Sequence, residues 1–144
     1  MSIDTMGKVL VTARIENLED LYMVDRGLIR TEEIRAVEVT DALVDTGATI
    51  LAMPSTLIQQ LGLKPLRARH ARTSAGPITV QVYGTVRLTI QGRQCPSDVS
   101  ELPDDCPVLI GQIPLESLDF VVDLAAQRLI GNPAHGGEHV IELY

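Results

Sequence analysis

The sequence predicts an all-β domain with two short helices. Valine, isoleucine and leucine are abundant while aromatic residues make up only 3% of the chain, so the core must be aliphatic, and β-branched side chains favour strands. Short apolar or alternating runs are separated by clusters of glycine, proline, aspartate and asparagine, which is typical of strands joined by turns. Helix-opening prolines precede two short segments only.

Strands are expected through the N-terminal third of the chain. Residues 8–15 alternate between polar and apolar side chains, as a half-buried strand does. The polar residues 16–20 predict a turn before the apolar run 21–24. Residues 34–40 alternate again and continue into the apolar run 39–44, which predicts a buried strand.

The helices are predicted over residues 54–61 and 114–118. Each begins with a proline, which suits the first helical turn, and Gly62 follows the end of the first helix. After the second helix, residues 120–124 and 128–130 predict a last hairpin.

A longer hairpin is predicted from residues 67–73 and 78–83, which flank the turn Ser74-Ala75-Gly76-Pro77. Gly76 can adopt a positive φ without steric cost, as a moving tip requires. The hairpin is compatible with a mobile flap and also with an ordinary surface hairpin.

The chain of 144 residues predicts one domain, 1–144, with a core over 8–132 and a C-terminal tail over 133–144. A net charge of −7, from 12 basic and 19 acidic residues, argues against a nucleic-acid partner. The N-terminus fits neither a signal peptide nor a membrane span, so a cytoplasmic protein is expected. Cys95 and Cys106 lie outside any CxxC spacing and are interpreted as structural or incidental thiols in a reducing compartment, with a disulfide between them as the less favoured alternative.

The most informative motif is the triplet Asp45-Thr46-Gly47, which directly follows the apolar run 39–44. It presents a carboxylate at a strand end. Gly47 lets the chain turn sharply and has no Cβ in the way of a group that approaches the carboxylate. The same residue types are common in ordinary turns, so the triplet alone is equally compatible with a turn of no function.

The order of motifs along the chain resembles that of the retropepsin-like aspartic proteases, and is closest to small bacterial members of that family. The resemblance covers residues 8–132, and Thr49 departs from it because family members usually carry Ser or Asp there. The similar segments are the catalytic loop at 42–49, the flap tip at 73–77, the following strand at 86–92, and the apolar-apolar-glycine strand end Pro107-Val108-Leu109-Ile110-Gly111 before a short helix.

The resemblance implies a closed β-barrel of the acid-protease type, with one lobe per chain, and an aspartic endopeptidase activity. Such hydrolysis needs two carboxylates about 3 Å apart that share one proton. Because this chain has a single Asp-Thr-Gly, the pair requires a homodimer with Asp45 of both subunits at the twofold axis. By resemblance, Thr46 forms a hydrogen bond across that axis and Gly47 completes the catalytic loop.

The resemblance also implies that Ala48 and the flap residues Ser74, Ala75 and Gly76 contact the substrate. This would be a peptide or protein bound as an added strand, and an aliphatic chain should build pockets that favour apolar residues near the cut. No cofactor is expected. The alternative function is a non-catalytic retropepsin-fold dimer that binds peptides or acts as a scaffold.

Two other clusters are interpreted as having no catalytic role. His135 and His139 have the spacing of a helical zinc pair, but the surrounding proline and glycines oppose a helix, so no metal site is expected and both are interpreted as surface histidines. Glu101, Asp104 and Asp105 are interpreted as members of a solvated loop.

Overall fold

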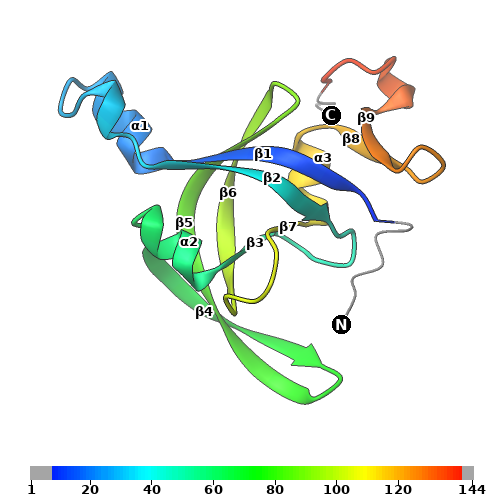
Figure 1. Cartoon of the computed structure of the whole chain (residues 1–144), viewed down its shortest axis with the longest axis horizontal. Helices are drawn as coiled ribbons and strands as arrows, with labels where there is room; N and C mark the ends of the chain where they lie inside the picture. The colour runs from blue at the N-terminus through cyan, green and yellow to red at the C-terminus, as the bar shows by residue number, and fades with distance from the viewer. Residues whose placement is uncertain (1–7, 141–144) are drawn as a thin grey trace, which may run out of the picture.

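The computed structural model describes residues 8–140, and its main feature is a mixed β-sheet that closes on itself (Figure 1). The strands are β1 (Leu10–Asn17), β2 (Ala36–Val44), β3 (Leu51–Pro54), β4 (Lys64–Thr73), β5 (Gly76–Ile90), β6 (Arg93–Leu102) and β7 (Leu109–Ile110). They run in the order β1-β2-β7-β3-β6-β5-β4, and a further pairing of β1 with β5 closes the ring and leaves β4 outside it. The predicted all-β, barrel-like fold is therefore confirmed.

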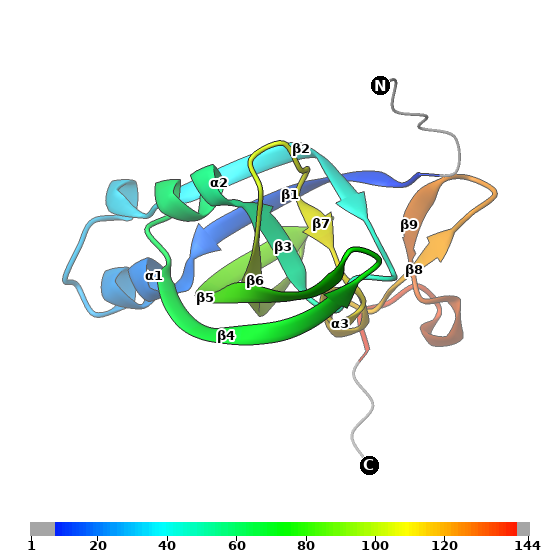
Figure 2. The ribbon, with the colours of Figure 1, turned by 90° about the horizontal axis from the view of Figure 1, so that it is seen from below.

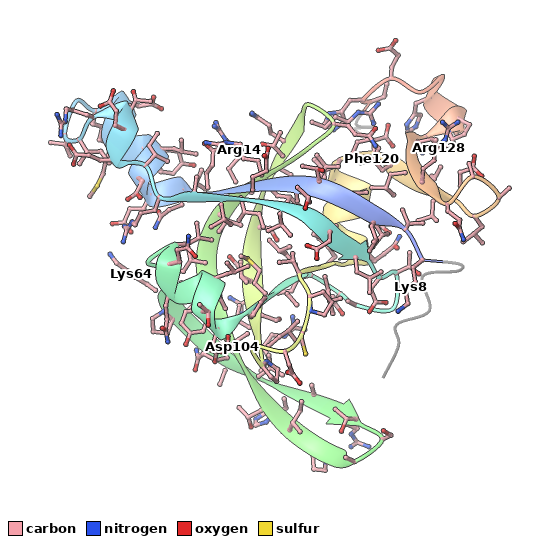
Figure 3. All side chains as sticks on the ribbon, viewed as in Figure 1. Lys8, Arg14, Lys64, Asp104, Phe120 and Arg128 are labelled. Atoms are coloured by element: carbon pink, nitrogen blue, oxygen red, sulfur yellow. The ribbon has the colours of Figure 1, made fainter. Side chains whose placement is uncertain are left out.

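A separate hairpin lies beside the barrel, formed by β8 (Phe120–Asp123) and β9 (Arg128–Gly131). It matches the last hairpin predicted from the sequence. Figure 3 shows Phe120 and Arg128 on it, beyond the barrel strands. The rest of the C-terminal tail has a single turn of 3₁₀-helix, η2 (Pro133–His135), and residues 141–144 of the predicted tail lie outside the described range.

The helices are short. They are α1 (Leu18–Asp25), α2 (Ser55–Gln60) and α3 (Gln112–Ser117), with a 3₁₀ turn, η1 (Thr31–Glu33), after the first. The predicted helix at 54–61 is α2, with Pro54 as its N-cap, and the helix predicted from Pro114 is α3, which begins earlier, at Gln112. None of the helices in residues 8–140 is long and apolar enough to cross a bilayer.

The turn predicted at residues 16–20 is wrong, because β1 continues to Asn17 and α1 follows directly. Asn17 is the N-cap of α1, and its side-chain oxygen accepts a hydrogen bond from the Asp20 backbone N at 3.0 Å. Asp20 also binds Arg35 at 2.9 Å, and this guanidinium lowers the pKa of the Asp20 carboxyl below its usual value. The polar residues therefore start a helix instead of forming a turn.

Strand β6 was not predicted from the sequence, and it contains Pro96, which cannot donate a hydrogen bond to a sheet. Gln91 and Gly92 adopt φ values of 50° and 79° and turn the chain back from β5 into β6. Pro96 lies opposite Arg87 of β5, while β3 pairs with β6 only from Val99 onward. Proline is tolerated at this position because its nitrogen faces an unpaired edge of the strand.

The inside of the barrel is aliphatic, as the composition predicts. Side chains that alternate along each strand point inward, and burial of each large one contributes roughly 1.5–3 kcal/mol. The largest fully buried side chains among the described residues are Ile15, Leu51, Met53, Ile58, Leu61, Leu88, Ile90, Ile110 and Leu118.

The predicted hairpin at 67–83 is confirmed as the β4–β5 hairpin, and its strands are longer than expected. Thr73 pairs with Gly76, so Ser74 and Ala75 form the tip. Gly76 has a φ of 115°, and the Thr73 hydroxyl donates a hydrogen bond to its carbonyl at 2.9 Å. The hairpin extends beyond the closed part of the sheet and curves across one face of the barrel (Figures 1 and 2).

Candidate active site

Asp45 lies at the first position after β2, at a strand end as the sequence predicts. The expectation that residues 39–44 form a buried strand is wrong, because only Ala42 of β2 is buried and Thr40 and Asp41 are exposed. Its backbone N–H donates to the Ile110 carbonyl of β7 at 3.0 Å, which continues the parallel pairing of β2 with β7. One carboxylate oxygen, Oδ1, accepts a hydrogen bond from the Gly47 backbone N at 2.9 Å. The backbone and the side chain of Asp45 are therefore both held, while the residue remains half-buried.

The rest of the Asp45 loop runs along the surface. Thr46 and Gly47 are exposed and Ala48 is half-buried. The Ala48 backbone N–H donates to the Asp45 carbonyl at 3.0 Å, which closes the turn. The Thr46 side chain forms no hydrogen bond within residues 8–140, so its hydroxyl is accessible to a second molecule.

Helix α3 holds the far end of this loop. The backbone N–H groups of Gln112 and Ile113 donate to the carbonyls of Ala48 and Thr49 at 2.9 and 3.0 Å. These are N–H groups of the first helical turn, which have no partner inside the helix. Gly111 sits at the crossing, where a Cβ would overlap the Ile50 carbonyl oxygen and lie 2.8 Å from the Ile50 nitrogen.

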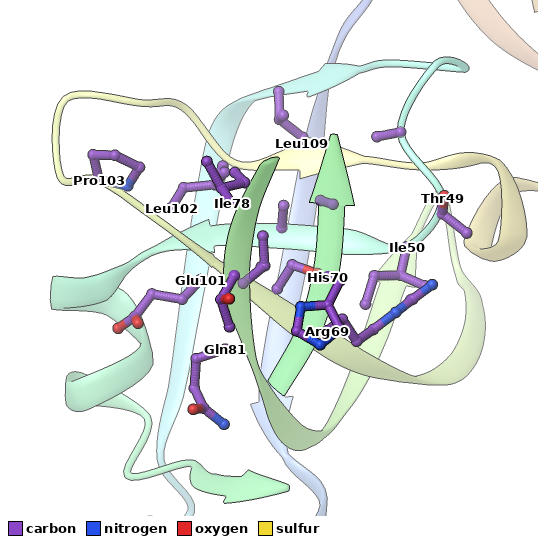
Figure 4. Close-up of a pocket in the computed structure, with 16 residues that line it drawn as sticks. Thr49, Ile50, Arg69, His70, Ile78, Gln81, Glu101, Leu102, Pro103 and Leu109 are labelled. Carbon is purple, nitrogen blue, oxygen red and sulfur yellow. The ribbon is translucent and has the colours of Figure 1, made fainter. Parts of the chain in front are cut away.

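Two cavities adjoin the loop. Asp45 and Thr46 line one of about 330 Å³, together with the apolar side chains Val9, Val44, Val122 and Leu124. Ala48 lines the other, a groove of about 450 Å³ between the β4–β5 hairpin and the barrel (Figure 4). Of the predicted site residues in the loop, Asp45 and Thr46 therefore lie at one cavity and Ala48 at the other, while Gly47 lines neither.

The groove has three walls. The first is the loop itself, through Ala48, Thr49 and Ile50, and the second is the hairpin. The third wall belongs to the barrel. The hairpin wall consists of Arg69, His70, Ala71 and residues 78–81. The barrel wall consists of Ala52, Leu109 and residues 100–103.

The predicted flap residues Ser74, Ala75 and Gly76 do not line the groove. They lie at the hairpin tip, where Ser74 and Ala75 are exposed and Ala75 N–H donates only to the Thr73 hydroxyl at 3.2 Å. The groove is instead bordered by the middle of the hairpin. Sequence reasoning missed Ile78, Val80 and Arg69 there, although the alternation of residues 78, 80 and 82 places them on one face.

His135 is not a surface histidine, so that interpretation is wrong. Its Nδ1 lies 2.7 Å from Asp119 Oδ2, and its side chain is only 18% exposed. This hydrogen bond, together with those from the Val140 backbone N–H and the Asn132 amide, holds the pKa of the Asp119 carboxyl at about 2. His139 Nε2 instead contacts the Ser117 carbonyl at 3.0 Å. No metal-binding cluster is found among residues 8–140.

The acidic cluster is only partly a solvated loop. Asp104 and Asp105 are exposed loop residues, and Asp104 accepts a hydrogen bond from the Thr56 N–H of α2 at 2.8 Å, which lowers the pKa of its carboxyl. Glu101 lies in β6 and lines the groove, which corrects its assignment to the loop. Cys95 and Cys106 are free thiols, and burial raises the pKa of Cys95 to about 11.

A comparison with known protein families covers both the Asp45 loop and the groove. The family model described as "gag-polyprotein putative aspartyl protease" matches residues 33–117, which is more than half of the chain. The matched range runs from the start of β2 through the Asp45 loop, the β4–β5 hairpin and Gly111 to the end of α3. No curated protein matches the chain.

Proposed function

The chain belongs to the retropepsin-like gag-polyprotein aspartyl protease family, and from that premise we propose that it is a homodimeric aspartic endopeptidase. The observation that carries the proposal is a single Asp-Thr-Gly, with the carboxylate of Asp45 half-buried at a strand end and Thr46 exposed beside it. One carboxylate cannot act as both the base and the acid of peptide hydrolysis. A second copy of the chain supplies the other.

In the proposed reaction, a water molecule lies between Asp45 and the partner subunit's Asp45. The ionised carboxylate takes a proton from the water, whose oxygen attacks the peptide carbonyl carbon, while the protonated carboxyl donates its proton to the carbonyl oxygen. The carboxyl that took the proton from water then gives it to the leaving nitrogen as the C–N bond breaks. The other carboxylate takes a proton from a hydroxyl of the tetrahedral intermediate, which leaves the new carboxyl group and restores the singly protonated pair. Because the working pair carries one proton, the rate should pass through a maximum on the acidic side.

The Asp45 loop supports this chemistry by its fixed geometry. The hydrogen bond from Gly47 N–H to Asp45 Oδ1 orients the carboxylate, and Gly111 brings α3 close enough to hold the loop from behind. We assign to Thr46 a positioning role: its exposed hydroxyl would form a hydrogen bond across the twofold axis and brace the two loops.

The groove supports a peptide substrate. It lies next to the loop, and Ala48, Ile78, Val80 and Leu109 give it apolar walls that suit apolar side chains near the cut. We propose that the substrate lies in it as an extended strand under the hairpin, whose tip, Ser74 to Gly76, closes as a lid.

The free thiols fit a reducing compartment, and we propose that the enzyme is cytoplasmic.

The test is the Asp45→Asn variant, assayed for peptide cleavage at acidic to neutral pH. We expect loss of turnover with an unchanged fold, because Asn preserves the shape of the side chain but cannot exchange the proton. Asp41→Asn is the matched control: it makes the same change at an exposed position of β2 and should leave turnover unaltered. Undiminished cleavage by Asp45→Asn would refute the proposal, and peptide binding without cleavage by the wild-type protein would favour the non-catalytic alternative.

A further inference from the structure

The β4 strand of the hairpin is rich in arginine although the chain as a whole has a net charge of −7. Arg67 is paired with Asp98 of β6 at 3.3 Å. Within residues 8–140, neither Arg69 nor Arg72 forms an ion pair with a carboxylate. Two cations of the hairpin are therefore left without a counter-charge.

The strand register puts these two arginines on opposite faces of the hairpin. Arg69 pairs with Val80, and residues two apart on a strand share a face, so Arg69 lies on the side of Val80 and the buried Val82. It lines the groove. Arg72 pairs with Pro77, one residue from the end of the hairpin, and falls on the other face. His70, Thr79 and Gln81 of that face also border the groove, but Arg72 does not line it.

The groove also contains one carboxylate, which is separated from Arg69. Glu101 comes from β6, and its closest polar partner is the Tyr83 hydroxyl at 3.5 Å. In Figure 4 the Arg69 side chain extends to the side of the groove where Thr49 and Ile50 lie, while Glu101 lies on the opposite side, near Pro103. The groove is thus positive next to the catalytic loop and negative away from it.

We propose that Arg69 makes the enzyme selective for peptides with an acidic side chain close to the cut, on the side of the groove next to Thr49 and Ile50. This inference rests on the proposed protease function and adds charge selectivity to it. The apolar residues around Arg69, Ala71, Ile78 and Val80, exclude water once a peptide fills the groove, which strengthens an ion pair there. Glu101 restricts the acidic residue to one position, because the same charge is repelled at the other end.

The experiment uses peptides with a central pair of apolar residues and a single Glu, Gln or Lys placed in turn at each flanking position. For the wild-type protein, we expect one position at which Glu gives a higher kcat/KM than Gln, by about fivefold for a partly solvated ion pair, and Lys a lower one. Arg69→Gln should abolish this preference. Arg69→Glu should reverse it in favour of Lys.

Arg72→Gln is the matched control, because it removes the same charge from the same strand at a position that does not line the groove, and should keep the preference for Glu. Both arginines are exposed, so the variants should fold. Binding of the same peptides to the Asp45→Asn variant, followed by fluorescence polarisation, separates this inference from the proposed function. Charge-selective binding that depends on Arg69 supports the inference even if no peptide is cut, and equal binding and cleavage of the Glu, Gln and Lys peptides would overturn it.

An ion pair between Arg69 and Glu101 in a closed hairpin is the main competing role for Arg69. In that case Arg69→Gln and Glu101→Gln would lower kcat/KM alike for every peptide, whatever its charge. Such a uniform loss would also overturn the inference.

Discussion

Two glycines are important for the Asp45 loop, and they differ in the atoms that an added Cβ would contact. At Gly111 a Cβ would overlap backbone atoms of Thr49 and Ile50, which cannot rotate away. At Gly47 it would lie 3.2 Å from Asp45 Oδ1, the end of a side chain that can turn. The first glycine is therefore required for packing, and the second for the orientation of the carboxylate.

We expect Gly111→Ala to lower the free energy of unfolding by roughly 1–3 kcal/mol, as overpacking does in a close-packed site. Gly47→Ala should change it by no more than ~0.5 kcal/mol, because the site is exposed, yet it should lower peptide cleavage by displacing the carboxylate. Urea unfolding and cleavage of one peptide, measured side by side on both variants, check this. Equal stabilities would show that α3 can move away from the loop without cost.

At the scale of elements, the tip of the β4–β5 hairpin has a constrained backbone conformation but no closely packed neighbours. Gly76 has a φ of 115°, a value that a β-branched residue adopts only with strain, and no atom lies within 4 Å of a Cβ placed there. The constraint is thus conformational and not steric packing. A substitution should distort the tip while the barrel remains intact.

We expect Gly76→Val to lower kcat/KM, because the strain of roughly 1–3 kcal/mol opens the Thr73–Gly76 turn and prevents closure of the lid. The melting temperature should fall only slightly, since the exposed tip can separate without exposing the core. Gly92→Val is the control and should preserve cleavage, because it makes the same change at a glycine of positive φ in the β5–β6 turn, where no atom lies within 4 Å of a Cβ and no groove residue is altered. Wild-type turnover in Gly76→Val would show that the hairpin is not a lid.

A second element, the turn η2, is attached to the end of α3 through Asp119. This residue has a φ of 58°, which Asn also tolerates, so Asp119→Asn removes the charge and leaves the backbone conformation in place. The pKa of Asp119 falls from its ordinary value of 3.8 to about 2 in the folded protein, mainly through the His135 hydrogen bond. Such a group stabilises the fold above the higher value, and its contribution is lost as the pH falls toward the lower one.

The wild-type protein should therefore lose stability between pH 4 and pH 2, and this loss should be smaller in Asp119→Asn. Melting temperatures across that pH range, with Asp41→Asn as the control for a general loss of negative charge, measure the difference. Parallel curves for the wild type and Asp119→Asn would mean that the contact with His135 contributes no pH-dependent stability.

At the scale of the whole molecule, the proposed dimer has a quantitative signature. If each active site needs Asp45 from both subunits, specific activity should rise with enzyme concentration near the dimer dissociation constant. A second measurement mixes the wild type with Asp45→Asn under conditions in which the subunits exchange between dimers. At constant total protein, the activity should be proportional to the square of the wild-type fraction. A linear dependence on that fraction, from a protein shown to be monomeric, would contradict the dimer.

Much of the site could be predicted from local sequence. A carboxylate directly after the apolar run 39–44, a glycine two residues on, and a glycine-tipped hairpin are patterns of neighbouring residues, and the structure places each of them as expected. They depend on strand periodicity and turn chemistry, which act over a few residues. Strand β6 and helix α1 were not predicted. Pro96 suits only an unpaired strand edge, and the N-cap Asn17 was interpreted as part of a turn because α1 follows β1 without a connecting loop.

The tertiary structure alone decided how these parts meet. Gly111 is required because the parallel pairing of β2 with β7 brings it against Thr49 and Ile50, residues far from it in the sequence. The register of β4 on β5 likewise turned Arg69, and not Arg72, toward the groove. A shift of one residue would move Arg69 to the other face of the hairpin, since side chains alternate between faces. The sequence by itself determined that an Asp-Thr-Gly loop would follow a strand, whereas long-range register, set by burial of one face of each strand, decided which charges surround it.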